Sequence, residues 1–483
     1  MFSMTYGAGK FVTAALAVGL AFAASAATFY VNCDAATGGD GSESSPFNSL
    51  ADAIGAAVPG DTLAVRGAIE VADPSQRIII PAEKEGIHIV PWGDGRLAIA
   101  AGPTYAASAG ANGTAILLIG AANATVSGID VTYAKNSLYD KNAKSLARLV
   151  TIGATNITLV GCTVRNLAAG ENPYGAPTTA VTCTNRTAAA HLTVRDCQFN
   201  GIRGYREDTH YGVFCISDYT TVENCFFTNC WSVTGKDSLI KNSRCRDFTF
   251  VSNTFFVANC KNGEGWWNTS KAWYGLFHSS YDEIGSGEIA YNILVAGDHM
   301  QSLFNYTHNY AFDSGTVKFH HNTALGFKYL FSGGSPDSNY GNNYGNNKAQ
   351  FEFFDNVLDV NTLFFENTSK PNPVTALKSG SFFRNNAFCT TNITVLCAGL
   401  ATTAETYDLF DILDFADNYP LTSPPVFIST EVASPDFYVP KSRLNPSWAA
   451  KRKALVETGG VRYPDFIGAR MFQPVKGTQV LLR

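Results

Sequence analysis

Lys241 and His278 are the two side chains whose types and positions best suit proton transfer. Lys241 stands in "SLIKNS" and His278 in "YGLFHSS", each directly after an apolar strand residue. Segments of the same type place other residues at this position, namely Cys215, Asn305, Ser332 and Phe365. If these segments are neighbouring parallel strands about 4.8 Å apart, Lys241, His278 and Asn305 follow one another on an outward face. A cationic neighbour lowers the pKa of an amine, which favours Lys241 as a base, with an ordinary solvated lysine as the alternative.

The loops that lead into these strands carry groups suited to an acidic sugar chain. They comprise Asn200–Gly212, Asn229–Ser238, Asn259–Gly275 and Ala296–Ser302, which we expect at one edge. Their candidate residues are Arg203, Arg206, Glu207, Asp208, His210, Asp237, Trp266, Trp267, Trp273, Asp298 and His299. Tryptophan faces can stack on sugar rings, and arginine can bind carboxylates, although the tryptophans could instead form a packed lid. A further outward row is expected two residues beyond the Lys241 position, at Ser217, Ser243 and Ser280.

This set of groups matches the needs of β-elimination on a uronate. The substrate carboxylate must be neutralised, a base must remove the weakly acidic C5 proton, and an acid must assist the leaving oxygen. We therefore predict a lyase with Lys241 as base and His278 as acid or partner. The predicted substrate-binding residues are Arg203, Arg206, Arg244, His210, Trp266, Trp267, Trp273 and Asn305, with Arg246 as a further carboxylate ligand.

Three other possibilities stay open from the sequence. A glycoside hydrolase would need two carboxylates, which Glu207, Asp208 and Asp237 could supply. A non-catalytic glycan-binding or cell-surface protein would use the same loops for affinity alone. No cofactor is predicted, and calcium is left open because acids such as Asp218 are scattered rather than spaced as a calcium motif.

A repeated unit, apolar-x-apolar-x-x-Asn/Cys-x-apolar, positions these groups. It occurs nine times, 28 to 39 residues apart, and its sixth column reads Ile129, Cys162, Cys197, Cys225, Asn253, Asn292, Asn322, Asn356 and Asn386. Such units bury their apolar faces only by stacking, so the column should form an inward asparagine ladder and a stack of thiols. Disulfides are the alternative for the thiols, including a Cys230–Cys260 bridge between coils. We expect His320 and His321 to be a strand-surface pair rather than a metal site.

A second strand before each unit completes a coil of three strands. Its buried column is Phe214, Ile240, Phe277, Phe304, Phe331 and Phe364, which predicts an all-β, single-stranded parallel β-helix. The chain resembles the secreted right-handed parallel β-helix proteins of the pectate-lyase-like superfamily. The segment Ser44–Gly67 resembles their entry segment, with Ser49 capping a short helix over the open end of the core. "PPVFIST", "SPDFYVP" and "DFIGAR" resemble their closing elements.

A local resemblance concerns "IKNS", which is similar to a segment of the chondroitinase-B and alginate lyase family. In that family the lysine is the base and an arginine one coil later is the acid. Only Lys241 matches, since His278 occupies the next coil. The calcium ligands of that family are not found at matching positions.

The sequence as a whole predicts an exported protein with one β-helix domain. Met1–Lys10, the apolar run Phe11–Ala23 and the small residues to Ala26 predict a signal peptide. We expect residues 1–26 as signal, 27–70 as entry strand and capping helix, 71–400 as coils and 401–483 as closing segment. A charge of −5 with pI near 5.9 offers no footprint for nucleic acid, and no later run is long enough to span a membrane. The expected product is a monomer, secreted, periplasmic or on the cell surface, that meets an extracellular polysaccharide.

Overall fold

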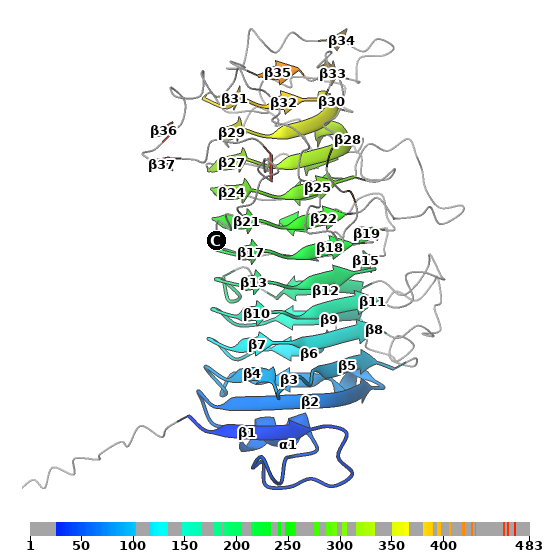
Figure 1. The fold of residues 1–483 in the computed structure, drawn as a ribbon, viewed down its shortest axis with the longest axis vertical. Helices are drawn as coiled ribbons and strands as arrows, with labels where there is room; N and C mark the ends of the chain where they lie inside the picture. Colours follow the sequence, from blue (N-terminus) through cyan, green and yellow to red (C-terminus); the bar gives the residue numbers. More distant parts are fainter. Residues whose placement is uncertain are drawn as a thin grey trace, which may run out of the picture.

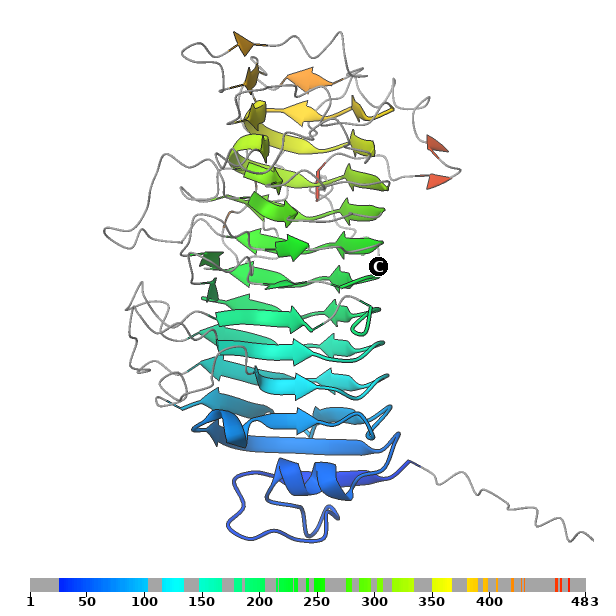
Figure 2. The same ribbon diagram turned by 180° about the vertical axis from the view of Figure 1, so that it is seen from behind.

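A computed structural model shows a long stack of parallel coils (Figures 1 and 2), which is the right-handed parallel β-helix expected from the repeat. It describes residues 26–102, 115–133, 147–166, 178–184, 187–204, 214–215, 217–228, 230–232, 240–242, 247–256, 275–279, 286–296, 302–306, 315–333, 350–366, 380–389 and 394–397, with short pieces at 405–406, 418–420, 427, 430, 457–458, 461–462 and 468–469. Residues 1–25 of the predicted signal peptide, which ends at Ala26, lie outside this set.

Each coil contributes one strand to each of three parallel sheets. The first sheet contains the first half of β2 (Thr62–Val71), then β4 (His88–Pro91), β7 (Thr125–Ser127), β10 (Thr158–Val160), β13 (Thr193–Arg195), β17 (Thr221–Glu223), β21 (Phe248–Val251), β24 (Gly287–Ala290), β27 (Thr316–His320), β29 (Gln350–Phe354) and β31 (Phe382–Arg384). The second contains the other half of β2, then β5 (Leu97–Ala101), β8 (Ile129–Tyr133), β11 (Thr163–Asn166), β14 (Gln198–Asn200), β18 (Phe226–Thr228), β22 (Thr254–Phe256), β25 (Ile293–Val295), the first halves of β28 (Thr323–Gly333) and β30 (Val357–Glu366), β32 (Ala387–Phe388) and β35 (Tyr419–Pro420).

The third sheet begins at β3 (Ile78–Ile80) and follows the loops that enter each coil. It continues through β6 (Ala115–Ile119), β9 (Ala147–Ile152), β12 (Thr178–Cys183), β16 (Phe214–Cys215), β20 (Ile240–Asn242), β23 (Gly275–Ser279), β26 (Ser302–Tyr306), the second halves of β28 and β30, and β33 (Thr394–Cys397). The remaining elements are β1 (Thr28–Asn32), which pairs with β2, the pair β15 (Arg203–Gly204) and β19 (Trp231–Ser232), β34 (Glu405–Thr406), the hairpin β36 (Glu457–Thr458) and β37 (Val461–Arg462), and the 3-10 turn η1 (Pro74–Gln76).

The bend between the first and second sheets explains the spacing of the repeat. The residue before each ladder position has a φ between 50° and 60°, at Gly128, Gly161, Asp196, Asn224, Ser252, Tyr291, His321, Asp355 and Asn385. One residue in this left-handed conformation turns the chain and reverses the inward–outward alternation. Glycine, asparagine and aspartate tolerate that conformation best, and they fill six of these nine bends.

The predicted asparagine ladder is present in the core. Each amide nitrogen donates to the next amide oxygen, from Asn253 to Asn292 at 3.1 Å and from Asn292 to Asn322 at 3.0 Å. The ladder continues through Asn356 and Asn386 and extends one coil further, to Asn418. A buried amide is stable only when its donors and acceptors are paired, and the stack pairs them coil by coil.

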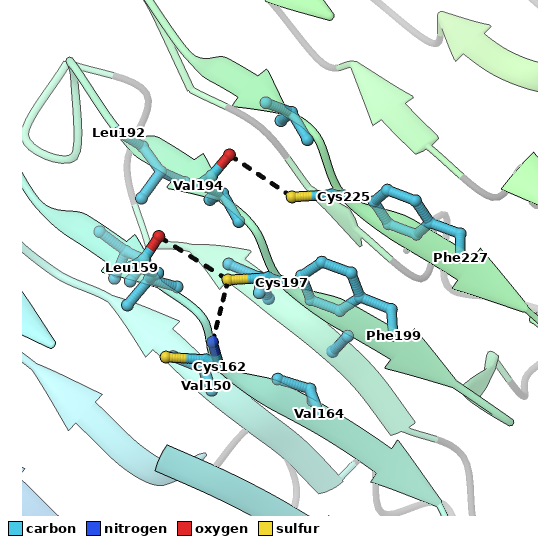
Figure 3. Close-up of a cluster of buried hydrophobic side chains, with 14 of the residues drawn as sticks. Val150, Leu159, Cys162, Val164, Leu192, Val194, Cys197, Phe199, Cys225 and Phe227 are labelled. Atoms are coloured by element: carbon cyan, nitrogen blue, oxygen red, sulfur yellow. Dashed lines mark hydrogen bonds between the residues drawn. The ribbon is translucent and has the colours of Figure 1, made fainter. Parts of the chain in front are cut away.

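Three cysteines continue this column toward the N-terminus as reduced thiols, as predicted (Figure 3). The backbone N–H of Cys162 donates to Sγ of Cys197 at 3.4 Å, and the thiol of Cys225 donates to Val194 O at 3.5 Å. Hydrogen bonding to Cys197, followed by burial, raises the pKa of Cys162 well above its usual value. The alternative bridge between Cys230 and Cys260 stays a prediction, because Cys260 lies outside the described residues; the Cys230 thiol donates to Thr228 O at 3.3 Å.

Helix α1 (Leu50–Ala56) covers the N-terminal end of the core, as expected. Ser49 is its N-cap, and the Ser49 hydroxyl accepts from the Asp52 N–H at 3.2 Å. Leu50 and Ile54 are buried against the first coils, while Lys84 Nζ donates to the terminal carbonyls of the helix. The cap therefore closes the apolar interior at this end of the stack.

Gly468 and Ala469, near the C-terminus, lie against the side of the stack. The Gly468 N–H donates to Asp355 O and the Ala469 N–H donates to Thr323 Oγ1, both at 2.9 Å. Ala469 also packs against Ile293 and Val295 on the outer face of β25. Ala469 of "DFIGAR" thus lies against an apolar part of the second sheet.

Candidate functional site

The third sheet brings the predicted catalytic residues into one register column. Lys241 of β20 pairs with His278 of β23, His278 pairs with Asn305 of β26, and Asn305 pairs with Ser332 of β28. These neighbours are about 4.8 Å apart along the stack, the spacing of paired strands. The predicted adjacency of Lys241 and His278 in the sheet is confirmed.

An aromatic stack supports this column from the core side. Phe277, Phe304 and Phe331 occupy the preceding register positions and are buried. Their ring centroids are 5.5 Å and 5.2 Å apart, with interplanar angles of 25° and 24°. Close packing of this kind fixes the strands under the column, so the spacing of its backbone positions is set by the core.

Toward the N-terminus the same column changes in character. Cys215 pairs with Lys241, and it is preceded by Thr182 and then Thr151. Both threonines are buried, and their hydroxyls lack hydrogen-bond partners within the structure. The Lys241–Ser332 stretch, with Lys, His, Asn and Ser in succession, is therefore the part of the column that carries titratable chemistry.

Two of the expected loops are described where they leave the second sheet. Arg203 begins β15, which pairs in parallel with β19 at Trp231, so two successive loops run side by side as they leave the second sheet. The other predicted site residues lie outside the described residues: Arg206, Glu207, Asp208, His210, Asp237, Arg244, Arg246, Trp266, Trp267, Trp273, Asp298 and His299. Their roles remain predictions.

The predicted outward serine row is wrong at Ser217. This side chain is fully buried, and its hydroxyl donates to Ala189 O at 2.5 Å. The Ser217 N–H also donates to Thr220 Oγ1 at 3.0 Å, which closes a local turn. Short polar side chains form such turns readily, so strand alternation stops at this point. Ser243 and Ser280 lie outside the described residues.

A second polar cluster lies at the bend after β27 and was not predicted as a site. His320 and His321, expected on the strand surface, are both fully buried. Their Nδ1 atoms are 3.0 Å apart, while Nε2 of His320 lies 2.9 Å from Glu288 Oε1 and Nε2 of His321 lies 3.6 Å from Asp355 Oδ2. Burial lowers the pKa of His320, and the hydrogen bond from His320 lowers the pKa of Glu288.

The sequence carried a weak signal for this cluster. His320 continues an outward column of the first sheet whose neighbours are Ala290 and Phe354, both buried. Phe354 stacks on the His320 ring at 4.7 Å, and Tyr291 lies 5.0 Å from His321. An apolar outward column indicates that something covers that face.

Neither a metal site nor a membrane span is found in the part of the chain that the structure describes. No three His, Cys, Asp or Glu side chains among these residues come together as metal ligands. No helix there could span a membrane. The calcium possibility rests on Asp208, Asp218 and Asp237, of which only Asp218 is described, and it is buried.

Comparison with a solved rhamnogalacturonan lyase supports the β-helix expectation at the level of fold, and two further structures are similar to this chain. A rhamnogalacturonan lyase aligns over 88% of this chain and 98% of its own, with a TM-score of 0.51 and 12% identity. A pectate lyase, Pel9A, aligns over 92% and 96% with a TM-score of 0.42 and 13% identity. A GH136 lacto-N-biosidase from Eubacterium ramulus aligns over 81% and 67% with a TM-score of 0.48 and 12% identity. No family model and no curated protein sequence matches this chain.

Proposed function

We propose that this β-helix protein cleaves an extracellular uronate-containing polysaccharide by β-elimination. The observation that carries the proposal is the register of the third sheet, in which Lys241, His278 and Asn305 follow one another on adjacent strands. The fold shared with a rhamnogalacturonan lyase is consistent with it, but fold alone does not determine chemistry.

In this reaction Lys241 removes the C5 proton of the uronate at the cleaved bond. His278, one strand further along, assists departure of the glycosidic oxygen or keeps Lys241 deprotonated through its own positive charge. Asn305 offers an amide to a substrate hydroxyl. Arg203, Arg206 or Arg244 neutralises the substrate carboxylate, because guanidinium pairs with carboxylate in a bidentate manner.

The test uses the purified full chain with a panel of uronate and neutral polysaccharides. Formation of unsaturated uronate ends is followed by ultraviolet absorbance, and reducing ends are measured in parallel. The wild-type protein should release unsaturated products from at least one uronate polymer. Lys241→Ala should lower the rate by roughly 100-fold or more, the usual contribution of a positioned base.

Arg195→Ala is the matched control, because it also removes one cationic side chain. Arg195 is exposed on β13 of the first sheet, so its removal should leave the rate unchanged. Equal rates for Lys241→Ala and wild type would refute the assignment of the base. Reducing ends without unsaturated ends would identify a hydrolase, and binding without turnover would identify a glycan-binding protein.

A further inference from the structure

The buried pair His320 and His321 has contacts that restrict how many protons it can hold. The His320 Nε2–H donates to the Glu288 carboxylate at 2.9 Å. A neutral imidazole has one N–H, so the Nδ1 atom of neutral His320 is bare and accepts the Nδ1–H of His321 across 3.0 Å. A proton on Nε2 of His321 then faces the Asp355 carboxylate at 3.6 Å. The pair thus accommodates one imidazolium between two carboxylates.

A second proton does not fit this geometry. It would place N–H groups on both Nδ1 atoms, and two donors facing each other at 3.0 Å repel. Both rings are fully buried, so water cannot screen that repulsion. The contact between the rings must therefore open when both are protonated.

Other charged groups face the pair from each neighbouring strand. Glu288 of β24 favours protonation, whereas Lys318 of β27 opposes it. On β29, Glu352 pairs in register with Lys318, and Asp355 follows at the bend. Arg384 of β31 pairs in register with Phe354 of β29. Its guanidinium carbon lies 4.8 Å from the centroid of the Phe382 ring.

The same bend contacts Gly468 and Ala469, near the C-terminus. Asp355 accepts the Gly468 N–H through its backbone oxygen, and Thr323, two residues after His321, accepts the Ala469 N–H. Gly468 has a φ of 77°, and a Cβ on it would come within 2.7 Å of Thr323 Oγ1. Gly468 and Ala469 are therefore fitted closely to the backbone that positions the two histidines.

We propose that the His320–His321 pair is an acid-sensitive latch: a second proton separates the rings and releases the backbone N–H groups of Gly468 and Ala469 from Asp355 and Thr323. The direction of the pH effect follows from burial, which lowers the pKa of His320. The latched state therefore holds the second proton less readily than the released state does. Release is therefore favoured as pH falls below the ordinary histidine range, and a single proton changes the equilibrium at most about tenfold per pH unit. This property does not depend on the proposed lyase activity.

Hydrogen exchange of the full chain at about pH 7 and pH 5 tests the latch, after correction for the intrinsic pH dependence of exchange. In the wild-type protein, peptides containing Gly468 and Ala469 should lose protection about tenfold or more at the lower pH. His321→Asn should remove most of this change. Asparagine suits the φ of 52° at this bend and occupies the equivalent bends at Asn224 and Asn385.

His191→Asn is the matched control, because His191 also has a positive φ of 60° but is exposed. It should behave as wild type. If His321→Asn does not fold, His320→Gln tests the same contact and should also flatten the pH dependence. Equal protection of wild type at both pH values would overturn the latch, as would an equal effect of His191→Asn. Parallel loss of protection in strand β7 would also overturn it, because the change would then be global unfolding.

Discussion

At the scale of the residue, each ladder asparagine is bonded to both neighbouring coils. The Asn322 amide oxygen accepts from the backbone and the side chain of Asn292, both at 3.0 Å. Its nitrogen donates to Ile289 O at 2.8 Å and to the Asn356 side chain at 3.1 Å. All these groups are buried, so the ladder stabilises the stack mainly because its loss would leave several polar groups unpaired.

We therefore predict that Asn322→Ala lowers the free energy of unfolding by about 3 kcal/mol, since each unpaired buried group costs about 1–3 kcal/mol. Urea denaturation of the full chain measures this change. The control is Gln198→Ala at an exposed position of β14, which should change stability by less than about 0.5 kcal/mol. Similar effects of the two substitutions would show that the ladder is not a stabilising element.

The cysteines show how the same column tolerates another chemistry. Cys197 is hydrogen-bonded to Cys162, which lowers its pKa, but its contact with Cys225 and burial outweigh this and raise the pKa to about 12. Such a thiol stays protonated and packs as a small apolar group with a weak donor. The hydrogen bonding along the column continues where cysteine gives way to asparagine, because the Cys225 N–H donates to Asn253 Oδ1 at 2.9 Å.

At the scale of the element, the left-handed residue in each bend determines where the first strand ends. Ser252 is exposed, has a φ of 58° and precedes Asn253. A non-glycine residue in this conformation costs roughly 1–2 kcal/mol, and a β-branched residue costs more.

Ser252→Gly should therefore stabilise the protein by about 0.5–1 kcal/mol, whereas Ser252→Val should destabilise it by about 1–2 kcal/mol. Thermal or urea unfolding measures both. Thr254→Gly, two residues on in extended β22, should have the opposite sign to Ser252→Gly, because glycine weakens a strand. Stabilisation by glycine at both positions would contradict the bend as the cause.

These local rules explain which elements the sequence predicts. The position of Asn253 and its equivalents indicates strand, bend and strand, and from that repeat the pairing of Lys241 with His278 follows. Ser217 departs from the predicted outward row because a local turn with Thr220 replaces the strand there. Asn418 extends the ladder by one coil, and its segment "LDFADNYP" keeps the apolar Leu413 and Phe415 of the repeat unit but has Pro420 at the last apolar position.

The burial of His320 and His321 could not be predicted for a different reason. Strand alternation assigns His320 to the outer face, and the apolar neighbours Ala290 and Phe354 in its column are a weak sign that this face is covered. The contacts with Glu288 and Asp355 join residues 32 and 34 positions apart, and they follow only from the register of the coils. The roles of the loop residues are unresolved for a similar reason, because loops outside the repeat have no register from which to place them.

At the scale of the whole molecule, a stack of coils transmits stability mainly between neighbours. Each coil pairs with the one before and the one after, so local stability can differ along the stack. The N-terminal end depends on α1, where Ile54 is buried against the first coils and Gly55 has open space around its Cβ position.

Ile54→Ala should therefore destabilise the N-terminal coils by about 2–4 kcal/mol through lost burial and a cavity. Its neighbour Gly55→Ala should stabilise the same coils by up to about 1 kcal/mol, because alanine favours the helix and meets no other atom. Hydrogen exchange should accelerate in β1 and β2 for the first variant and slow in the same strands for the second. Strands β27 and β29 should be unaffected in both, because the helix contacts only the first coils. Equal acceleration in β2 and β29 would instead show that the whole stack unfolds as one unit, and that α1 then supports the Lys241 column as well as the end of the core.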